Sequence, residues 1–354
     1  MSAEQMKRRI AAQATSLQRV LSHHVSAGNE AMQQAAALMR RSRQIVITGM
    51  GASYYAALPL ESHLCGLGMN VIAVEAGEYL HFRPHAYPDA VVVVVSRSGE
   101  SIEIVKLLAA LRGRQPVIGI TNRPESRLAQ SADIAIDIHS LDDDIVALQT
   151  YTGTLLALAL LGRAVEQEGA LALREAESLL PEVQRLVDAS LASISTWDPF
   201  LSPGHALYLL ARGGSFASAL EGALLFHEVA KAPAVAMPTA SFRHGPVEVV
   251  NDHFRAILFA PDTPTQPLNL ALAQDLVRFG GEVRVIGPRI HMPAGLAHLE
   301  TPRVPALYAP MLEILPVQVA ALRLAEMRGI VPGSFRFAPP VATDEASFTT
   351  PLSQ

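Results

Sequence analysis

The sequence contains one cysteine, Cys65, among its 354 residues. A single cysteine excludes an intrachain disulfide and a cysteine-based zinc cluster, so we interpret Cys65 as a small buried hydrophobe. Lysine is scarce as well, because only Lys7, Lys106 and Lys231 occur. This scarcity restricts Schiff-base chemistry to few candidates.

The chain also lacks long hydrophobic runs and an excess of positive charge. No stretch approaches the roughly 20 uninterrupted apolar residues that a membrane helix needs, and the first residues lack the apolar core of a secretory signal. The net charge of −5 and the pI near 6.2 argue against a nucleic-acid binder. We therefore expect a soluble, cytoplasmic protein with no nucleic-acid or membrane partner.

Short apolar runs alternate with helical patterns along most of the chain. Residues 2 to about 40 predict two helices separated near Gly28, and residues 150 to about 196 are mostly helical. The expected strands are 45–47, 71–74, 90–95 and 117–120, then one from Ala206, 255–259 and 283–286, with a helix over 268–279. Such alternation predicts an α/β fold with parallel sheets covered on both faces.

The two halves of the chain repeat one pattern. Residues 51–58 and 213–220 match in order as small, hydroxyl, aromatic and apolar classes, each after an apolar run. The predicted division is a helical N-terminal segment (1–35), a phosphate-binding domain (36–165), a helical connection (166–195), a catalytic domain (196–335) and a tail (336–354). Within the phosphate-binding domain, residues 141–144 (Leu-Asp-Asp-Asp) predict a solvated loop whose charges need no function.

Hydroxyl groups follow two expected strands of the first half. Ser53 follows one strand, whereas Ser96, Ser98 and Ser101 follow another. Loops at the carboxyl ends of parallel strands lie together and open helices whose N–H groups face an anion, which suits a phosphate monoester. The alternatives are that these serines are helix caps, or a nucleotide site, for which the glycine motifs are missing. In the second half Ala260-Pro261-Asp262 replaces the serine-rich loop, so one site per chain is expected.

A second group of candidates lies on the helix that begins near Ala217. Glu228 has apolar sequence neighbours, so we expect it to be buried among them and to be a candidate base. Glu221 is expected to pair with Arg212 or Arg243. His244 follows in a loop before Gly-Pro and could shuttle protons. Two histidines of the N-terminal region, His23 and His24, are interpreted as a helix surface feature, and no metal site or cofactor is expected.

Together these motifs resemble the sugar isomerase (SIS) domain family in its double-domain form, over roughly residues 6 to 335. Within this family, the chain is similar to the isomerase half of glucosamine-6-phosphate synthase and to the stand-alone enzymes grouped with it, among them amino-sugar-phosphate deaminases and fructosamine-6-phosphate deglycases. It rests on residues 51–54, 96–101, 220–224 with Glu228, and 244–246. It implies two flavodoxin-like, doubly wound parallel-sheet domains with helical N-terminal and connecting segments.

The resemblance also implies roles for individual residues. Glu228 would be the enolising base, and His244 would serve ring opening across a homodimer interface. Ser53, Ser96, Arg97, Ser98 and Ser101 would hold the sugar phosphate, and Gly51, Ala52, Thr150 and Glu221 would lie at the sugar.

Three departures shape the expected activity. Leu225 stands where the synthase has lysine, residues 335–354 contain no lysine, and Arg97 stands where glutamine is common. No glutamine-hydrolysing domain precedes residue 1, so glutaminase activity is not expected. We therefore expect C1/C2 enolisation of an amino-sugar or fructosamine 6-phosphate, giving isomerisation, deamination or deglycation. The alternative is a non-catalytic phosphosugar sensor.

Overall fold

The computed structural model describes residues 1–354 except 203, 338, 340 and 346–354. The chain divides into two compact units. Unit 1 comprises Met1–Ala11 and Pro181–Ser334, and unit 2 comprises Ala12–Leu180 with the described residues from Phe335 on. Among the described residues, no helix is both long enough and apolar enough to cross a membrane.

Unit 2 is built around a five-stranded parallel sheet with the order β2-β1-β3-β4-β5. Its strands are β1 (Ile45–Gly49), β2 (Val71–Glu75), β3 (Val91–Val95), β4 (Val117–Thr121) and β5 (Ile134–Asp137). The central β1, β3 and β4 are buried along their whole length. They are continuous apolar runs because both faces of the sheet are covered.

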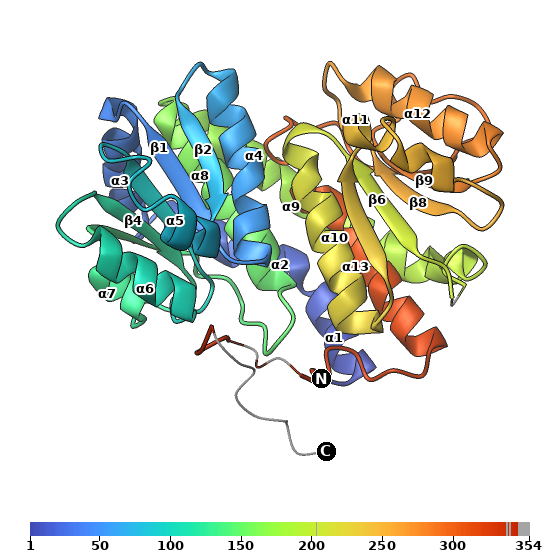
Figure 1. The fold of residues 1–354 in the computed structure, drawn as a ribbon, viewed down its shortest axis with the longest axis horizontal. Coiled ribbons are helices and arrows are strands. Elements are labelled where there is room, and N and C mark those ends of the chain that lie inside the picture. Colours follow the sequence, from blue (N-terminus) through green and yellow to red (C-terminus); the bar gives the residue numbers. More distant parts are fainter. Residues whose placement is uncertain (203, 338, 340, 346–354) are drawn as a thin grey trace. The chain divides into compact units, whose positions relative to one another are not determined.

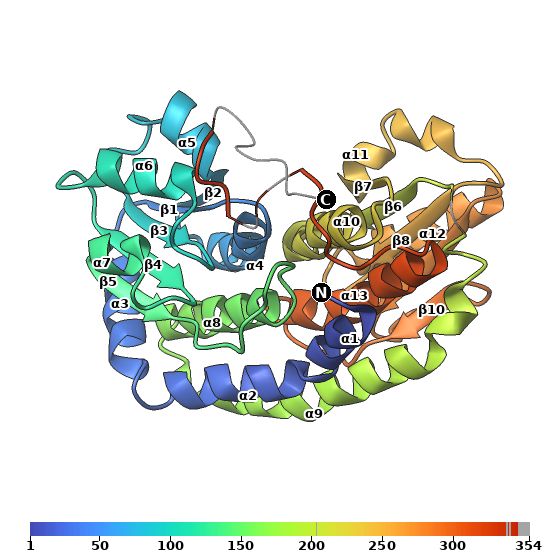
Figure 2. The same ribbon diagram turned by 90° about the horizontal axis from the view of Figure 1, so that it is seen from below.

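Helices cover both faces of this sheet. One layer holds α2 (Gln13–His24), α3 (Asn29–Arg41), α4 (Ala52–Gly66) and α8 (Gln149–Val165), and the other holds α5 (Ala76–Phe82), α6 (Ile102–Leu111) and α7 (Arg127–Ser131). Figure 2 shows the strands between these two layers. Tyr79 and Leu107 pack with the valines of β3 in the core of the second layer.

Unit 1 repeats the same topology, with the order β10-β9-β8-β6-β7. The strands are β6 (Leu207–Ala211), β7 (Ala234–Pro238), β8 (Arg255–Phe259), β9 (Glu282–Gly287) and β10 (Ala297–Glu300). The helices are α1 (Ala3–Ala11), α10 (Phe216–Ala230), α11 (Thr239–Phe242), α12 (Gln266–Arg278) and α13 (Ala309–Met327); α9 (Gly169–Ser193) runs from unit 2 into unit 1 (Figure 1). The α/β doubly wound fold and its duplication are therefore confirmed.

Four expectations from the sequence were wrong in detail. The N-terminal region forms three helices, because the chain also breaks at Ala12. Cys65 is exposed rather than buried. His24 is not a surface residue, since its side chain is 4% exposed. Asp143, assigned to a solvated loop, is 3% exposed.

Candidate active site

The two serine-bearing loops of unit 2 start side by side. Gly49 and Val95, the last residues of β1 and β3, are register partners. The strand order reverses between β1 and β3, because β2 is added on one side of β1 whereas β3, β4 and β5 follow on the other side. Ligands bind at such a point in open parallel sheets. A Cβ atom at position 49 would lie 2.7 Å from the carbonyl oxygen of Val95, so glycine allows this close approach.

The helix-cap alternative for the serines does not describe the structure. The N-cap of α4 is Gly51, and the N-cap of α6 is Ser101, whose side chain makes no capping hydrogen bond. Ser53 follows Gly51 by two residues and is partly exposed. Ser53 therefore lies in the first turn of α4, and Ser101 occupies the N-cap position of α6 without a side-chain capping bond, so neither hydroxyl is used to cap its helix.

Ser96 and Ser98 organise the loop after β3. The Ser96 hydroxyl accepts from the N–H of Gly99 at 3.1 Å, and the Ser98 hydroxyl accepts from the N–H of Glu100 at 3.2 Å. Each hydroxyl keeps its own proton to donate to an anion. Gly99 has φ +65°, and a Cβ there would lie 2.2 Å from the Ser126 hydroxyl, so the loop needs glycine at this position.

The described part of the C-terminal segment reaches the same loop. The N–H of Ile102, in the first turn of α6, donates to the carbonyl oxygen of Ala342 at 3.0 Å. The Glu345 carboxylate pairs with Lys106 of α6 and, at 3.1 Å, with His81 of α5. Hydrogen bonds with Lys106, which has the larger effect, and with His81 lower the pKa of Glu345. No pattern in the sequence predicted this contact.

Arg97 and Thr150 are tied to the segment between β5 and α8. The Arg97 guanidinium donates to the carbonyl oxygen of Ile145 at 3.1 Å. Thr150 is 1% exposed, and its hydroxyl donates to the Asp143 carboxylate at 2.7 Å. Asp143 also accepts from the N–H groups of Leu148 and Thr150, each at 2.8 Å. Burial raises the pKa of Asp143, and these hydrogen bonds oppose the rise.

Glu228 and His244 lie towards opposite ends of the strands in the unit 1 sheet. Because α10 connects the parallel neighbours β6 and β7, it runs antiparallel to them. Glu228, near the end of α10, therefore lies towards the amino ends of the strands, about 18 Å along the helix from Phe216 at 1.5 Å per residue. His244 is exposed and follows β7 at the carboxyl ends.

The buried carboxylates of unit 1 are Glu221 and Glu313 rather than Glu228, which is partly exposed. The expectation that Glu228 is buried among apolar side chains was therefore wrong. Glu313 lies on α13, and its two oxygens accept from Ser215 at 2.8 Å and Ser218 at 2.6 Å. Burial raises the pKa of Glu313 to about 7, against the effect of these two hydrogen bonds.

Glu313 changes how the second copy of the repeat must be interpreted. Ser215 is the counterpart of Ser53 in the repeat, and it donates to an internal carboxylate at the start of α10. In the second half a carboxyl group of the chain itself is therefore the hydrogen-bond partner of this serine, whereas Ser53 in the first half is partly exposed. Sequence reasoning missed Glu313, although a lone glutamate within the apolar run 309–322 was the available signal.

Comparison with known proteins agrees with this architecture. The family model described as SIS domain matches residues 38–163 and 200–325. Glutamine–fructose-6-phosphate aminotransferase (isomerizing) of Pyrobaculum aerophilum is 28% identical over 299 residues, which are 82% of this chain and 50% of that protein. Its Pyrococcus horikoshii counterpart is also 28% identical, over 85% of this chain and 51% of that protein. The chain thus spans about half the length of these relatives.

Solved structures share the fold across nearly the whole chain. The C-terminal domain of glucosamine-fructose-6-phosphate aminotransferase from Francisella tularensis superposes with a TM-score of 0.81 at 20% identity, covering 92% of this chain and 96% of that one. Tagatose-6-phosphate ketose/aldose isomerase from Escherichia coli gives 0.79 at 20% identity, covering 93% and 94%. Glucosamine-6-phosphate deaminase from Thermotoga maritima gives 0.73 at 21% identity, covering 95% and 99%. With two matched segments and two sheets of the same topology, the chain belongs to the SIS domain family.

Proposed function

We propose that this chain is a phosphosugar isomerase-type enzyme whose phosphate site lies at the carboxyl ends of the strands in the unit 2 sheet. The observation that carries the proposal is the register pairing of Gly49 with Val95. Because these residues end neighbouring strands, the segments that lead to Ser53 and Ser96 begin side by side. The structural relatives include a tagatose-6-phosphate ketose/aldose isomerase and a glucosamine-6-phosphate deaminase, which supports the same class of substrate.

The phosphate would be held by hydroxyl groups and by the start of a helix. Ser53, Ser98 and Ser101 are partly exposed and can donate to phosphate oxygens. Ser96 is buried, and its hydroxyl accepts from the N–H of Gly99 within the loop. The N-terminus of α6 adds a favourable dipole. Arg97 supplies a positive charge beside the loop, and Gly51 and Ala52 at the N-terminal end of α4 would lie at the sugar. Thr150 and Glu221 are each 1% exposed, so the fold encloses both side chains and they are left out of the proposed sugar-binding set.

The proposed chemistry is a proton transfer between C1 and C2 of the open-chain sugar. Glu228 removes the proton from one carbon to give an enediol or enolamine, and a proton is returned to the neighbouring carbon. His244 opens the ring by moving a proton between the ring oxygen and the anomeric hydroxyl. With nitrogen on C2, the resulting C2 imine is hydrolysed by water to ketose and ammonia. With a substituted nitrogen on C1, hydrolysis of the C1 imine gives the aldose and the free amine.

Topology favours a homodimer for this reaction. Glu228 and His244 of one chain lie towards opposite ends of the strands of the same sheet. Within that sheet, the two side chains of one copy therefore do not reach the same sugar. A His244 supplied by a second copy removes this conflict. The symmetric pair would then hold two equivalent sites, each with Glu228 from one copy and His244 from the other.

A phosphosugar sensor is the second candidate function. Its supporting observation is that Glu228 is partly exposed, since an exposed carboxylate needs no catalytic role to be tolerated. A sensor would use the same phosphate site but would leave the sugar unchanged. The two candidates therefore differ at Glu228 and agree at Ser98.

The test is a coupled assay of the purified chain with glucosamine 6-phosphate, galactosamine 6-phosphate and fructose-amino-acid 6-phosphates, scoring ammonia or amine release and aldose–ketose exchange. The enzyme proposal expects turnover that Glu228→Gln abolishes while ligand-induced thermal stabilisation persists. The matched control is Glu248→Gln, an exposed glutamate of the same unit. Stabilisation by a sugar phosphate without turnover in the unmodified chain would overturn the enzyme proposal and favour the sensor.

A further inference from the structure

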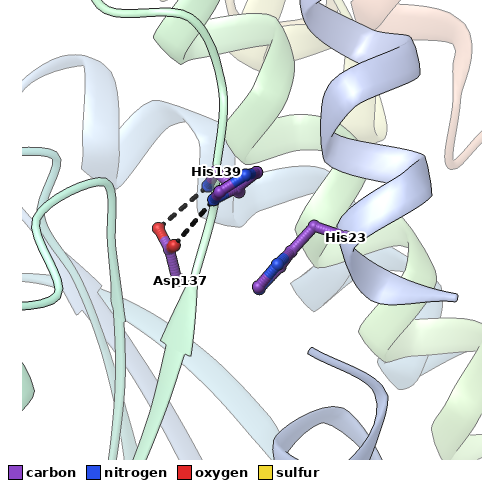
Figure 3. Close-up of side chains that lie close together, drawn as sticks. All are labelled: His23, Asp137 and His139. Carbon is purple, nitrogen blue, oxygen red and sulfur yellow. Dashed lines mark hydrogen bonds and ion pairs between the residues drawn. The ribbon is translucent and has the colours of Figure 1, made fainter. Parts of the chain in front are cut away.

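His23 meets two side chains from a distant part of the sequence, Asp137 and His139, at the end of β5 in unit 2. His23 comes from the last turn of α2, whereas Asp137 ends β5 and His139 follows it by two residues (Figure 3). One ligand atom from each lies within 4.8 Å of the other two. All three are partly exposed, so the cluster is open to solvent.

Asp137 and His139 are held together by two hydrogen bonds. The backbone N–H of His139 donates to one carboxylate oxygen at 3.0 Å, and ring Nδ1 lies 3.0 Å from the other. This arrangement requires His139 to adopt φ +61°, the left-handed conformation that only a few per cent of non-glycine residues occupy. The backbone therefore holds the imidazole against the carboxylate at some conformational cost.

His23 completes the cluster from the helix. Its ring stacks on that of His139, with centroids 4.4 Å apart and planes 16° from parallel. Burial, then the neighbouring His139, lowers the pKa of His23. Arg19 is the positive charge nearest to the cluster on α2, and it donates through Nε to the carbonyl oxygen of His139 at 3.2 Å. Arg19 is exposed, so water screens its charge.

We propose that His23, Asp137 and His139 form a binding site for a divalent transition-metal ion of the Zn²⁺ class. Two imidazole nitrogens and one carboxylate oxygen are a ligand set that Zn²⁺ prefers, with water in the fourth position. The 3.0 Å separation between His139 Nδ1 and Asp137 Oδ2 is close to the roughly 3.4 Å between neighbouring ligands of a tetrahedral ion bound at about 2.1 Å.

Binding requires a local rearrangement that the geometry specifies. A metal ion lies in the plane of each imidazole that binds it, so two parallel rings cannot face one ion. His23 therefore turns out of the stack, which its partly exposed position on the last turn of α2 allows. As the metal takes the lone pair of His139 Nδ1, the proton of the neutral ring moves through solvent to Nε2, so the bound imidazole stays neutral.

The proposed ion would link His23 of α2 to Asp137 and His139 at the end of the edge strand β5. Strand β5 is the outermost strand, two places from β3, so the site lies about 10 Å from the serine loop at 4.8 Å per strand. It shares no residue with the proposed phosphate site. Metal binding is therefore expected to stabilise unit 2 without requiring a sugar phosphate.

The test is calorimetric titration of Zn²⁺ into the metal-free full chain at pH 7, with the same titration for His23→Gln and His139→Asn. Asparagine is chosen at 139 because it tolerates the left-handed conformation. The control is His253→Gln, since His253 stacks on His205 at 5.3 Å but belongs to no such cluster among the described residues. Circular dichroism checks that each variant keeps its helical content.

We expect one Zn²⁺ per chain, binding at least tenfold weaker in both site variants and unchanged in the control, and no response to Mg²⁺, which prefers oxygen ligands. Co²⁺ should give a visible absorption band that both site variants lose. The proposal is overturned if the unmodified chain shows no saturable Zn²⁺ binding, or if folded His23→Gln and His139→Asn bind as tightly as the control. Neither result depends on the sugar reaction.

Discussion

Replacing Glu313 with glutamine should change how the stability of unit 1 depends on pH. The carboxyl group is 1% exposed and accepts hydrogen bonds from two uncharged donors, the hydroxyl groups of Ser215 and Ser218. Its pKa rises from the ordinary value of 4.5 to about 7 in the fold. Ionisation is therefore harder in the folded chain than in the unfolded chain.

The sign of the effect follows from this raised pKa. The stabilising contribution is fully present below pH 4.5 and is lost as the pH rises through 7, because the unfolded carboxyl ionises first. At about 1.4 kcal/mol per pKa difference of one, the free energy of unfolding should fall by roughly 2 to 3 kcal/mol between pH 5 and pH 8. Glu313→Gln should remove this fall, since an amide keeps the shape and can bond to both hydroxyls.

The assay uses the only tryptophan of the chain. Trp197 lies in unit 1 and is 5% exposed, so its fluorescence reports the unfolding of the unit that contains Glu313. Urea denaturation at pH 5, 6, 7 and 8 is compared for the unmodified chain, Glu313→Gln and the exposed control Glu248→Gln. Parallel pH profiles for the unmodified chain and Glu313→Gln would refute the reasoning.

Three further predictions concern the site and its support. Ser98→Ala should raise the KM or Kd for a sugar phosphate about tenfold with little change in kcat, because one hydrogen bond to a charged group is worth about 1.5–3 kcal/mol; steady-state kinetics with exposed Ser131→Ala as control would contradict this if both variants behaved alike. Mixing inactive Glu228→Gln with inactive His244→Asn should restore about a quarter of the activity if the two residues come from different copies of a dimer, and no recovery after confirmed subunit exchange argues against a shared site. Asp143→Ala should lower the free energy of unfolding of unit 2 by about 2–4 kcal/mol because it removes the acceptor for three donors at the start of α8; hydrogen exchange of α8 measures this, and equal protection in the exposed control Asp144→Ala would contradict it.

The sequence by itself determined the doubly wound fold and its duplication. Central strands such as β3 are buried on both faces, so they appear as uninterrupted apolar runs. The edge strands β5, β7 and β10 were not predicted, because each is only partly buried and lacks such a run. The order of the motifs, with Ser53 and Ser96 each shortly after a strand, was likewise enough to predict the location of the proposed phosphate site.

Only the tertiary structure decided which polar side chains are buried and which distant residues meet. Asp143 and Glu313 look like ordinary charged residues in the sequence, but the fold buries them against hydroxyl and N–H donors. His23 meets His139 across more than a hundred residues because β5 closes the sheet beside α2. Local sequence patterns record the periodicity of burial within one element, whereas these contacts depend on which elements the sheet order makes neighbours.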